Sequence, residues 1–398
     1  MRLSARAKAM SPSPTMAIDT KSKQLMAEGI DVVNFSVGEP DFDTPAHVKR
    51  AGVRAIEGGF TKYTPAAGTL ELRKAICQKL QNENGLEYKP EQIVVSNGGK
   101  QSLYNAFLVI LDPGDEVIIP APYWVSYPEM VKLADGVPVT VFADDSTGFK
   151  ITPDMLKAKL TSRTRAIVIN SPSNPTGAVY SKDELFALCQ IAVEHDLIIV
   201  TDEIYEKLLY EGAKHVSIAA FGPEFKQRTI TVNGMSKAYA MTGWRMGYTA
   251  SESIYAKAMG DLQSQTTSGP SSISQKAAVE ALIGTQAPVE EMRLEFDFRR
   301  QHMKERLNQI PGFEVKVAPQ GAFYLFPKVS KLFGTTIRGR KINNCDDLGT
   351  VILEEAKVGV VPGSGFGAPD YIRFSYATSM ERIDEGLNRI EALIKEAK

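Results

Sequence analysis

The chain has 398 residues, of which 43% are hydrophobic and 23% charged, and its formal net charge at pH 7 is −1. This length is sufficient for two domains around a substantial core. The balanced charge argues against a nucleic-acid-binding surface, and no apolar run approaches the ~20 residues of a membrane helix. Three widely spaced cysteines and four histidines without ligand spacing indicate neither a disulfide framework nor a metal site. The first ten residues lack the apolar core of a signal peptide, so a cytoplasmic protein is expected.

Five apolar, β-branched runs predict buried strands, and helical patterns separate them. The predicted strands cover residues 93–96, 116–120, 166–170, 197–201 and 229–233, and the helical stretches include 181–195. Alternation of strand and helix is typical of an α/β fold, in which helices cover both faces of a mainly parallel sheet.

The pattern changes near residue 290. A long charged helix is predicted over 290–309, followed by short strands around 313–317 and 322–326 and by further helix. We therefore predict three parts of the chain: an N-terminal arm that also contributes to a small domain (1–44), a large domain (45–288) and a small C-terminal domain (289–398).

The motif Ser96-Asn97-Gly98-Gly99-Lys100 joins a predicted strand to a helical pattern. Glycines let backbone N–H groups approach a phosphate, and the amino terminus of a helix favours the negative charge. The spacing differs from that of a nucleotide-binding P-loop, so a phosphate site of another kind is indicated. Trp124 follows the next strand, where its indole could stack on a flat ring or could belong to the core.

Polar side chains follow the next two strands as well. Asn174 lies in a loop stiffened by Pro172 and Pro175, which aim its amide, although a plain turn is an alternative interpretation. Asp202 falls at a strand's carboxyl end, where a carboxylate can pair with a protonated ring nitrogen, and Tyr205 comes three residues later. The alternative here is a helix N-cap aspartate followed by a core tyrosine.

Lys237 is the best candidate for a covalent catalyst. It follows Ser236 just after the strand at 229–233, and burial at such a strand end lowers the pKa of an amine. A neutral amine can form a Schiff base with an aldehyde, and the guanidinium of Arg245 suits a phosphate. An aldehyde and a phosphate on one molecule predict pyridoxal phosphate as the cofactor.

Arg373 is a candidate for carboxylate binding. The segment from Tyr371 to Ser375 alternates like a strand that places one charge among apolar neighbours. A guanidinium can bind a carboxylate through two parallel hydrogen bonds. Without a further argument, a solvent-facing arginine on an edge strand is the simpler interpretation.

Together these motifs resemble the fold-type I, class I aminotransferases, and within them the bacterial and plant-plastid aspartate aminotransferases that include prephenate aminotransferases. The resemblance covers essentially the whole length, from Ser36-Val37-Gly38-Glu39-Pro40-Asp41-Phe42 to Ile372-Arg373-Phe374-Ser375-Tyr376-Ala377-Thr378. It implies a large domain that binds pyridoxal phosphate and a small domain formed from both termini. It also implies transamination between aspartate and 2-oxoglutarate, and of prephenate to arogenate with glutamate or aspartate as the donor.

The resemblance implies a role for each candidate residue. Lys237 is the catalytic Schiff-base lysine, Asp202 is the partner of the pyridinium nitrogen, and Tyr205 and Asn174 are ligands of the ring's 3-oxygen. Trp124 stacks on the ring and also borders the substrate. The cofactor's phosphate lies among the remaining polar groups, namely Gly99, Lys100, Ser236 and Arg245.

The substrate contacts are also implied by the resemblance. Arg373 binds the α-carboxylate, with Asn174 and the backbone of Gly38 beside it. Lys100 and Thr15 match the pair that prephenate-using members of this subgroup use for acidic substrates. Residues 265–270 hold no arginine of the kind that reads the second carboxylate in animal-type aspartate aminotransferases.

Tyr63 implies an assembly, because the tyrosine at this point of the family's pattern reaches the phosphate of the neighbouring subunit's cofactor. A homodimer with shared active sites is therefore expected. Three alternatives stay open: an aminotransferase for aromatic or neutral amino acids, a lyase with the same cofactor and fold, and a binding or regulatory protein that retains the fold.

Overall fold

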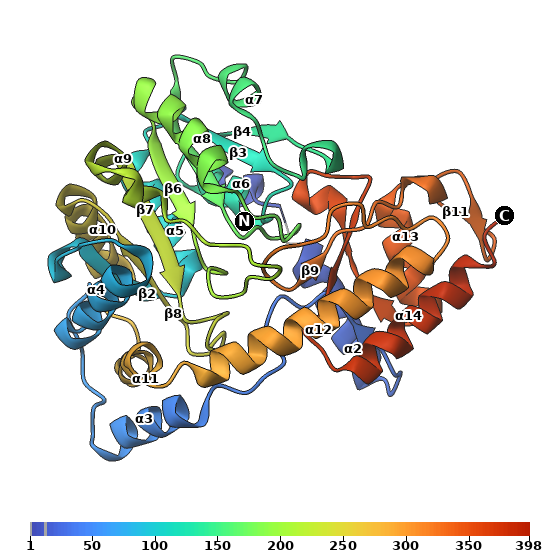
Figure 1. Cartoon of the computed structure of the whole chain (residues 1–398), viewed down its shortest axis with the longest axis horizontal. Helices are drawn as coiled ribbons and strands as arrows, with labels where there is room; N and C mark the ends of the chain where they lie inside the picture. Colours follow the sequence, from blue (N-terminus) through green and yellow to red (C-terminus); the bar gives the residue numbers. More distant parts are fainter. Residues whose placement is uncertain (1, 12–13) are drawn as a thin grey trace.

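The computed structural model describes residues 2–11 and 14–398, which fold around a seven-stranded sheet (Figure 1). The strand order is β2-β8-β7-β6-β5-β3-β4. The bounds are β2 Ile93–Asn97, β3 Glu116–Ala121, β4 Val137–Phe142, β5 Thr164–Asn170, β6 Ile198–Asp202, β7 Thr229–Gly234 and β8 Met246–Ala250. Neighbouring strands are parallel, except that β8 runs antiparallel to β2 and β7. The predicted α/β fold with a mainly parallel sheet is confirmed.

All five predicted strands are present, with ends within two residues of the expected ones. Strands β4 and β8 are not predicted from the sequence. Strand β4 lies at the sheet edge, contains Pro138 and is partly exposed, so it lacks a continuous apolar pattern. Strand β8 contains Gly247, where a Cβ would lie 2.3 Å from the backbone nitrogen of Gly99. This glycine therefore lets β8 approach the start of the helix that follows β2.

Alternate residues of the central strands are buried in two separate cores. Val117, Val168 and Val200 face a core that includes side chains of α5 (Gly99–Ile110), α6 (Ser126–Leu133) and α10 (Ser253–Thr266). Their neighbours in sequence, such as Ile118 and Ile199, face a core shared with α8 (Lys182–Glu194) and α9 (Pro223–Arg228). Burial on both faces is the reason that these strands read as continuous apolar runs.

The C-terminal part is built around a three-stranded sheet in the order β13-β14-β9, formed by Val361–Pro362, Ile372–Ser375 and Tyr324–Leu325. The long helix α12, Ala287–Gln309, leads into it across the molecule (Figure 1). This helix matches the prediction over 290–309. The predicted strand at 313–317 is wrong, because that segment contributes only an isolated bridge between Glu314 and Lys328.

The N-terminal segment joins this C-terminal part. Strand β1, Val33–Asn34, pairs in parallel with β12, Val358–Gly359, and Phe35 packs on Phe374 of β14. The domain boundaries at residues 44 and 288 stay a prediction.

The other elements complete the description. They are α1 Ala5–Ala9, α2 Pro14–Ala27, α3 Ala46–Glu57, α4 Leu70–Asn84, α7 Pro153–Lys157, α11 Ser272–Ile283, β10 Thr336–Ile337, β11 Arg340–Lys341, α13 Cys345–Val351 and α14 Met380–Ile394. Within residues 2–11 and 14–398, no helix is both long enough and apolar enough to span a bilayer.

Candidate active site

A cavity of about 470 Å³ lies at the carboxyl ends of the parallel strands, where ligands of open α/β sheets bind. Strands β5, β6 and β7 end at its wall, and the N-terminal segment and β14 close it from the other side. Eleven of the thirteen candidate site residues line it: Gly38, Gly99, Lys100, Trp124, Asn174, Asp202, Tyr205, Ser236, Lys237, Arg245 and Arg373. Segments that are almost 340 residues apart in sequence thus meet in one cavity. Arg373 and Ser36, which are joined by a hydrogen bond, are an example.

The cavity carries an excess of positive charge. Its lining includes five cationic side chains, of which Lys23 is one not predicted, and three acidic ones, Asp19, Glu39 and Asp202. Because low-dielectric walls strengthen such a field, the cavity favours anionic ligands.

Lys237 lies beyond the end of β7, part-buried between aromatic rings. Its Nζ lies 5.9 Å from the ring centroid of Tyr205 and 5.8 Å from that of Phe323, and it donates a hydrogen bond to the Gly38 carbonyl. Burial lowers the pKa of Lys237 to about 8, and Arg373 and Arg245 act in the same direction. The amine is therefore much easier to deprotonate than an exposed lysine.

The lowered pKa predicts a pH-dependent stability for the ligand-free protein. Below pH 8 both folded and unfolded states bind the proton, so the buried ammonium destabilises the folded state. Between about pH 8 and the ordinary value of 10.5, only the unfolded lysine keeps its proton, so the free energy of unfolding rises with pH. We expect Lys237→Met to be more stable than the unsubstituted protein at pH 7, by about 1–3 kcal/mol, and this advantage to shrink towards pH 10.5. Urea denaturation at pH 7 and near pH 10.5 measures the free energy of unfolding of both proteins. The same difference between them at the two pH values would contradict the prediction.

Asp202 is the last residue of β6 and is 6% exposed. It accepts hydrogen bonds from the Tyr127 hydroxyl (2.7 Å) and the Ile204 backbone N–H (3.2 Å). Burial raises the pKa of Asp202 to about 6, although these two hydrogen bonds oppose the rise. A carboxylate in this setting is stabilised by any additional N–H donor, which suits the protonated nitrogen of a ring.

Tyr205 follows on the same turn, and its hydroxyl is 2.8 Å from the hydroxyl of Tyr324. Gly38 lies against this pair, because a Cβ on Gly38 would lie 2.9 Å from the Tyr324 hydroxyl oxygen. A side chain at residue 38 would therefore displace the Tyr324 hydroxyl where the N-terminal segment crosses the cavity.

The amino end of α5 forms the opposite wall. Gly98 has a φ of +80°, and a Cβ there would lie 2.3 Å from an Nη atom of Arg245, so the guanidinium lies directly against this glycine. The Arg245 guanidinium donates to the carbonyls of Thr242 (3.0 Å) and Asn97 (3.3 Å), which fixes its orientation. The free N–H groups of a helix amino end beside a guanidinium form a site for a phosphate.

Lys100 borders the same wall. Its Nζ lies 4.9 Å from the ring centroid of Trp124, and burial together with the nearby Arg245 lowers the pKa of Lys100. The Trp124 ring in turn meets Tyr127 edge-on, at 5.3 Å between centroids. An anion next to Lys100 would offset the repulsion between the two cations.

Arg373 is 2% exposed and lies on β14, the central strand of its sheet. The interpretation as a solvent-facing edge-strand arginine is therefore wrong. Its guanidinium donates to the Asn174 side-chain oxygen (3.0 Å) and to the Ser36 carbonyl (2.7 Å), and it lies 4.4 Å from the Tyr324 ring centroid. Among the described residues, no acidic side chain forms an ion pair with it. A buried guanidinium without an ionic partner is well suited to bind an anionic ligand.

The other two candidates lie apart from this cavity or outside the described side chains. Tyr63 is 98% exposed and borders a separate surface hollow with Lys62, Leu70 and Lys276. Thr15 belongs to α2, but its side chain lies outside the described part of the chain.

Two tyrosines that contact the candidate residues are not predicted from the sequence. Tyr127, which donates to Asp202, lies in the first turn of α6, three residues after Trp124, and its position close behind a predicted strand is the signal that could have identified it. Tyr324, which contacts Tyr205 and Arg373, carries no local signal, because only the fold brings it to the cavity.

Comparisons with known proteins agree with this geometry. The family model "Aminotransferase class I and II" matches residues 30–390. An aspartate aminotransferase from Bacillus sp. (strain YM-2) is 50% identical over 393 residues, which is 99% of each chain. A probable aspartate/prephenate aminotransferase from Aquifex aeolicus is 48% identical over 396 residues, again 99% of each.

Solved structures are similar over the whole chain as well. The aspartate aminotransferase of Rhizobium meliloti superposes with a TM-score of 0.96 at 44% identity and covers 100% of both chains. The aspartate aminotransferase of Thermus thermophilus with maleate gives a TM-score of 0.93 at 46% identity, covering 99% of this chain and 100% of that one. The chain therefore belongs to the class I and II aminotransferase family.

Proposed function

We propose that this protein is a pyridoxal-phosphate-dependent aspartate aminotransferase. It would transfer the amino group of L-aspartate to 2-oxoglutarate, giving oxaloacetate and L-glutamate, and would also convert prephenate to arogenate. One observation carries the proposal: the amine of Lys237, with its pKa lowered to about 8, and the buried guanidinium of Arg373, without an acidic partner among the described residues, line the same cavity.

The donor set of the cavity fits the cofactor. Gly99, Lys100, Ser236 and Arg245 would hold its phosphate, because they combine a helix amino end with two cations and a hydroxyl. Asp202 would accept the ring N–H, and Trp124 would cover the ring. The cofactor, when bound, supplies an aldehyde that links to amino groups and a ring that withdraws electrons from the substrate's Cα.

The 3-oxygen of the ring would bind Tyr205 and Asn174. The side-chain oxygen of Asn174 already accepts from Arg373, and this orientation leaves its Nδ2 group as the donor. The Tyr205 hydroxyl can both donate and accept a hydrogen bond. One of these bonds is made with Tyr324, so the other is available for the 3-oxygen of the ring.

The side chains divide the work of the reaction. Arg373 holds the α-carboxylate of the amino acid through two hydrogen bonds, with Asn174 and the Gly38 backbone beside it. Lys237, in its neutral form, removes the proton from the substrate's Cα. General acid–base catalysis of this kind contributes roughly 10²–10⁴-fold to the rate.

The preference for acidic substrates rests on Lys100 and Thr15 and on the excess positive charge of the cavity. Burial and the nearby Arg245 disfavour the protonated form of Lys100. A second carboxylate of the substrate, next to Lys100, would stabilise that protonated form. The names of the relatives support the same class of substrate, and maleate, bound in the Thermus thermophilus structure, is a dicarboxylate.

Half-reactions of the purified protein with pyridoxal phosphate test the proposal. We expect L-aspartate to change the visible absorbance of the bound cofactor, and both 2-oxoglutarate and prephenate to restore it. Recovery with 2-oxoglutarate alone would remove prephenate from the function. A response only to aromatic or neutral amino acids would support a different aminotransferase, and release of pyruvate or ammonia would indicate a lyase.

We also propose a homodimer with shared active sites. The proposal is supported by Tyr63, which is exposed and lies outside the cavity of its own subunit.

Tyr63→Phe removes one hydrogen bond to a charged group, so the Kd for pyridoxal phosphate should rise about tenfold. Titration of the cofactor-free protein measures it, with Tyr255→Phe on α10 as the control. Sedimentation should show a dimer. An unchanged Kd for Tyr63→Phe would contradict the shared site.

A further inference from the structure

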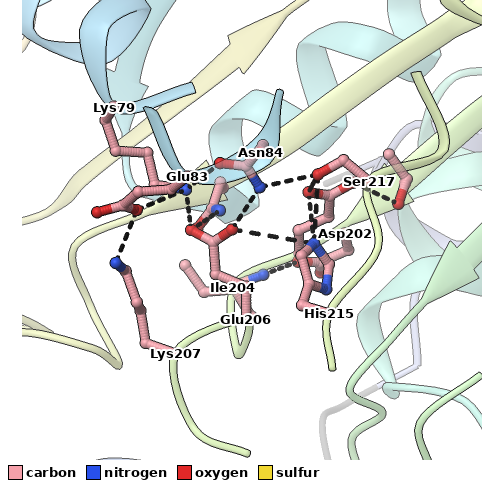
Figure 2. A network of polar contacts seen from close by, with 12 residues as sticks. Lys79, Glu83, Asn84, Asp202, Ile204, Glu206, Lys207, His215 and Ser217 are labelled. Atoms are coloured by element: carbon pink, nitrogen blue, oxygen red, sulfur yellow. Dashed lines mark hydrogen bonds and ion pairs between the residues drawn. The ribbon is translucent and has the colours of Figure 1, made fainter. Parts of the chain in front are cut away.

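The turn that follows β6 has two faces. Asp202 and Tyr205 line the active-site cavity, whereas Glu203 and Glu206 are absent from its lining. These two glutamates instead enter a cluster of polar side chains behind the turn, shown in Figure 2 and here called the buried network. Its members are Lys79, Asn84, Glu203, Glu206, His215 and Ser217.

Glu206 ties the turn to α4 and to β7. It forms an ion pair with Lys79, and it accepts hydrogen bonds from the side-chain amides of Asn84 and Asn233, each at 2.8 Å. The exposed fractions of the Lys79 and Glu206 side chains are only 4% and 8%. The contact therefore joins two charges in a region of low dielectric, where an ion pair is strong and a single charge is costly.

Glu203 ties the other side of the turn to the segment that contains residues 215–217. Its carboxylate contacts His215 Nε2 at 2.8 Å and accepts a hydrogen bond from the Ser217 hydroxyl at 2.7 Å. Asn84 also donates to Ser217 at 2.8 Å, so the contacts of the two glutamates form one connected set.

The charged members of the buried network, Lys79, Glu203, Glu206 and His215, stabilise one another. Burial opposes the charged forms, but the Glu203 carboxylate raises the pKa of His215, and the Lys79 ammonium lowers the pKa of Glu206 to about 2. The Glu206 carboxylate is therefore ionised near neutral pH, and the contact with Glu203 favours the protonated imidazole of His215. Loss of one charged member leaves a buried charge without its partner, which costs far more than the loss of a surface ion pair.

A bound divalent cation is the alternative explanation for this arrangement. Glu203, Glu206 and His215 offer ligand atoms within 4.8 Å of one another. However, Lys79 already contacts Glu206, and Ser217 donates to the Glu203 oxygen that also faces His215. The protein thus supplies the compensating positive charge from its own side chains.

We propose that Glu203, Glu206, Lys79 and His215 are positioning residues for the cofactor. They fix the turn from behind, so that Asp202 and Tyr205 keep their places in the cavity. The inference rests on the proposed roles of those two residues. Displacement of catalytic groups by about 1 Å can cost roughly 10²-fold in rate, so a network that restrains this turn has a large effect without touching the cofactor.

Glu206→Gln and His215→Asn test the inference, with Glu116→Gln as the matched control. Glu116 is also a buried carboxylate, 4% exposed, that accepts a hydrogen bond and forms an ion pair, but it lies at the start of β3, the end of the strand away from the cavity. Three quantities are measured: the Kd for pyridoxal phosphate, the visible circular dichroism of the bound cofactor, and Tm.

We expect both network variants to raise the Kd about tenfold or more and to alter the circular dichroism band, because Asp202 and Tyr205 shift against the ring. The control should lower Tm alone. Lower Tm with an unchanged Kd and band in both network variants would overturn the inference. If Glu206→Gln does not fold, His215→Asn retains the ion pair between Lys79 and Glu206 and decides the question. If the unsubstituted protein does not bind pyridoxal phosphate, the proposed function fails first, and the inference fails with it.

Discussion

Replacing Lys237 by methionine is expected to abolish amino-group transfer. Methionine has a similar length and suits the apolar surroundings of Tyr205 and Phe323, so the fold should persist. It has no nitrogen to link to the cofactor or to take the Cα proton. Since loss of the acid–base step alone costs about 10²–10⁴-fold and the covalent link is lost as well, turnover should fall to the background of the assay.

Oxaloacetate formation from aspartate and 2-oxoglutarate, coupled to NADH oxidation by malate dehydrogenase, measures this loss. Lys257→Met on α10 is the control, because Lys257 is exposed and, among the residues that the structure describes, forms an ion pair only with Asp261 on the same helix. That variant should keep its full rate. A Lys237→Met protein that retains about a tenth of the unsubstituted rate would contradict the assignment of Lys237 as the base.

Five of the seven strands of the large sheet could be predicted because their signal is local. Strands buried on both faces need apolar, β-branched residues at every position, and such runs are visible without knowledge of the partners. Strand β4 lacks this signal because it lies at the edge, and the segment at 313–317 carries an alternation that the fold does not use for pairing. Local pattern does not reveal which segments meet across the chain.

Part of the candidate site could also be predicted, because some of its residues carry a local signal in the sequence. Asp202, Asn174 and Lys237 come within about four residues of the ends of predicted strands, so topology places them at one edge of the sheet. The contact of Arg373 with Ser36 and the network behind Glu203 join segments far apart in sequence, and no spacing rule encodes them. The family resemblance supplies Arg373 as a site residue, and the family match over residues 30–390 confirms the resemblance itself.

Arg373→Lys is expected to reduce kcat/KM for aspartate by about 10²–10³-fold, mainly through KM. The guanidinium is fixed by Asn174 and Ser36 so that its remaining N–H groups can meet a carboxylate with two hydrogen bonds. A lysine keeps the charge but offers a single donor point, so only part of the roughly 3–5 kcal/mol of such a buried contact survives. Steady-state kinetics with varied aspartate measure the loss.

Arg300→Lys provides the matched control. Arg300 is 1% exposed and pairs with Glu211 and Asp297 away from the cavity, so this variant should lower Tm and leave KM unchanged. The Kd for pyridoxal phosphate should be the same in the Arg373→Lys protein, because Arg373 is assigned to the substrate and the phosphate to Arg245. The decisive comparison uses an amine without an α-carboxylate: the unsubstituted and Arg373→Lys proteins should react with it equally slowly. A further loss with that amine would mean that Arg373 acts on the cofactor site and not on the substrate's carboxylate.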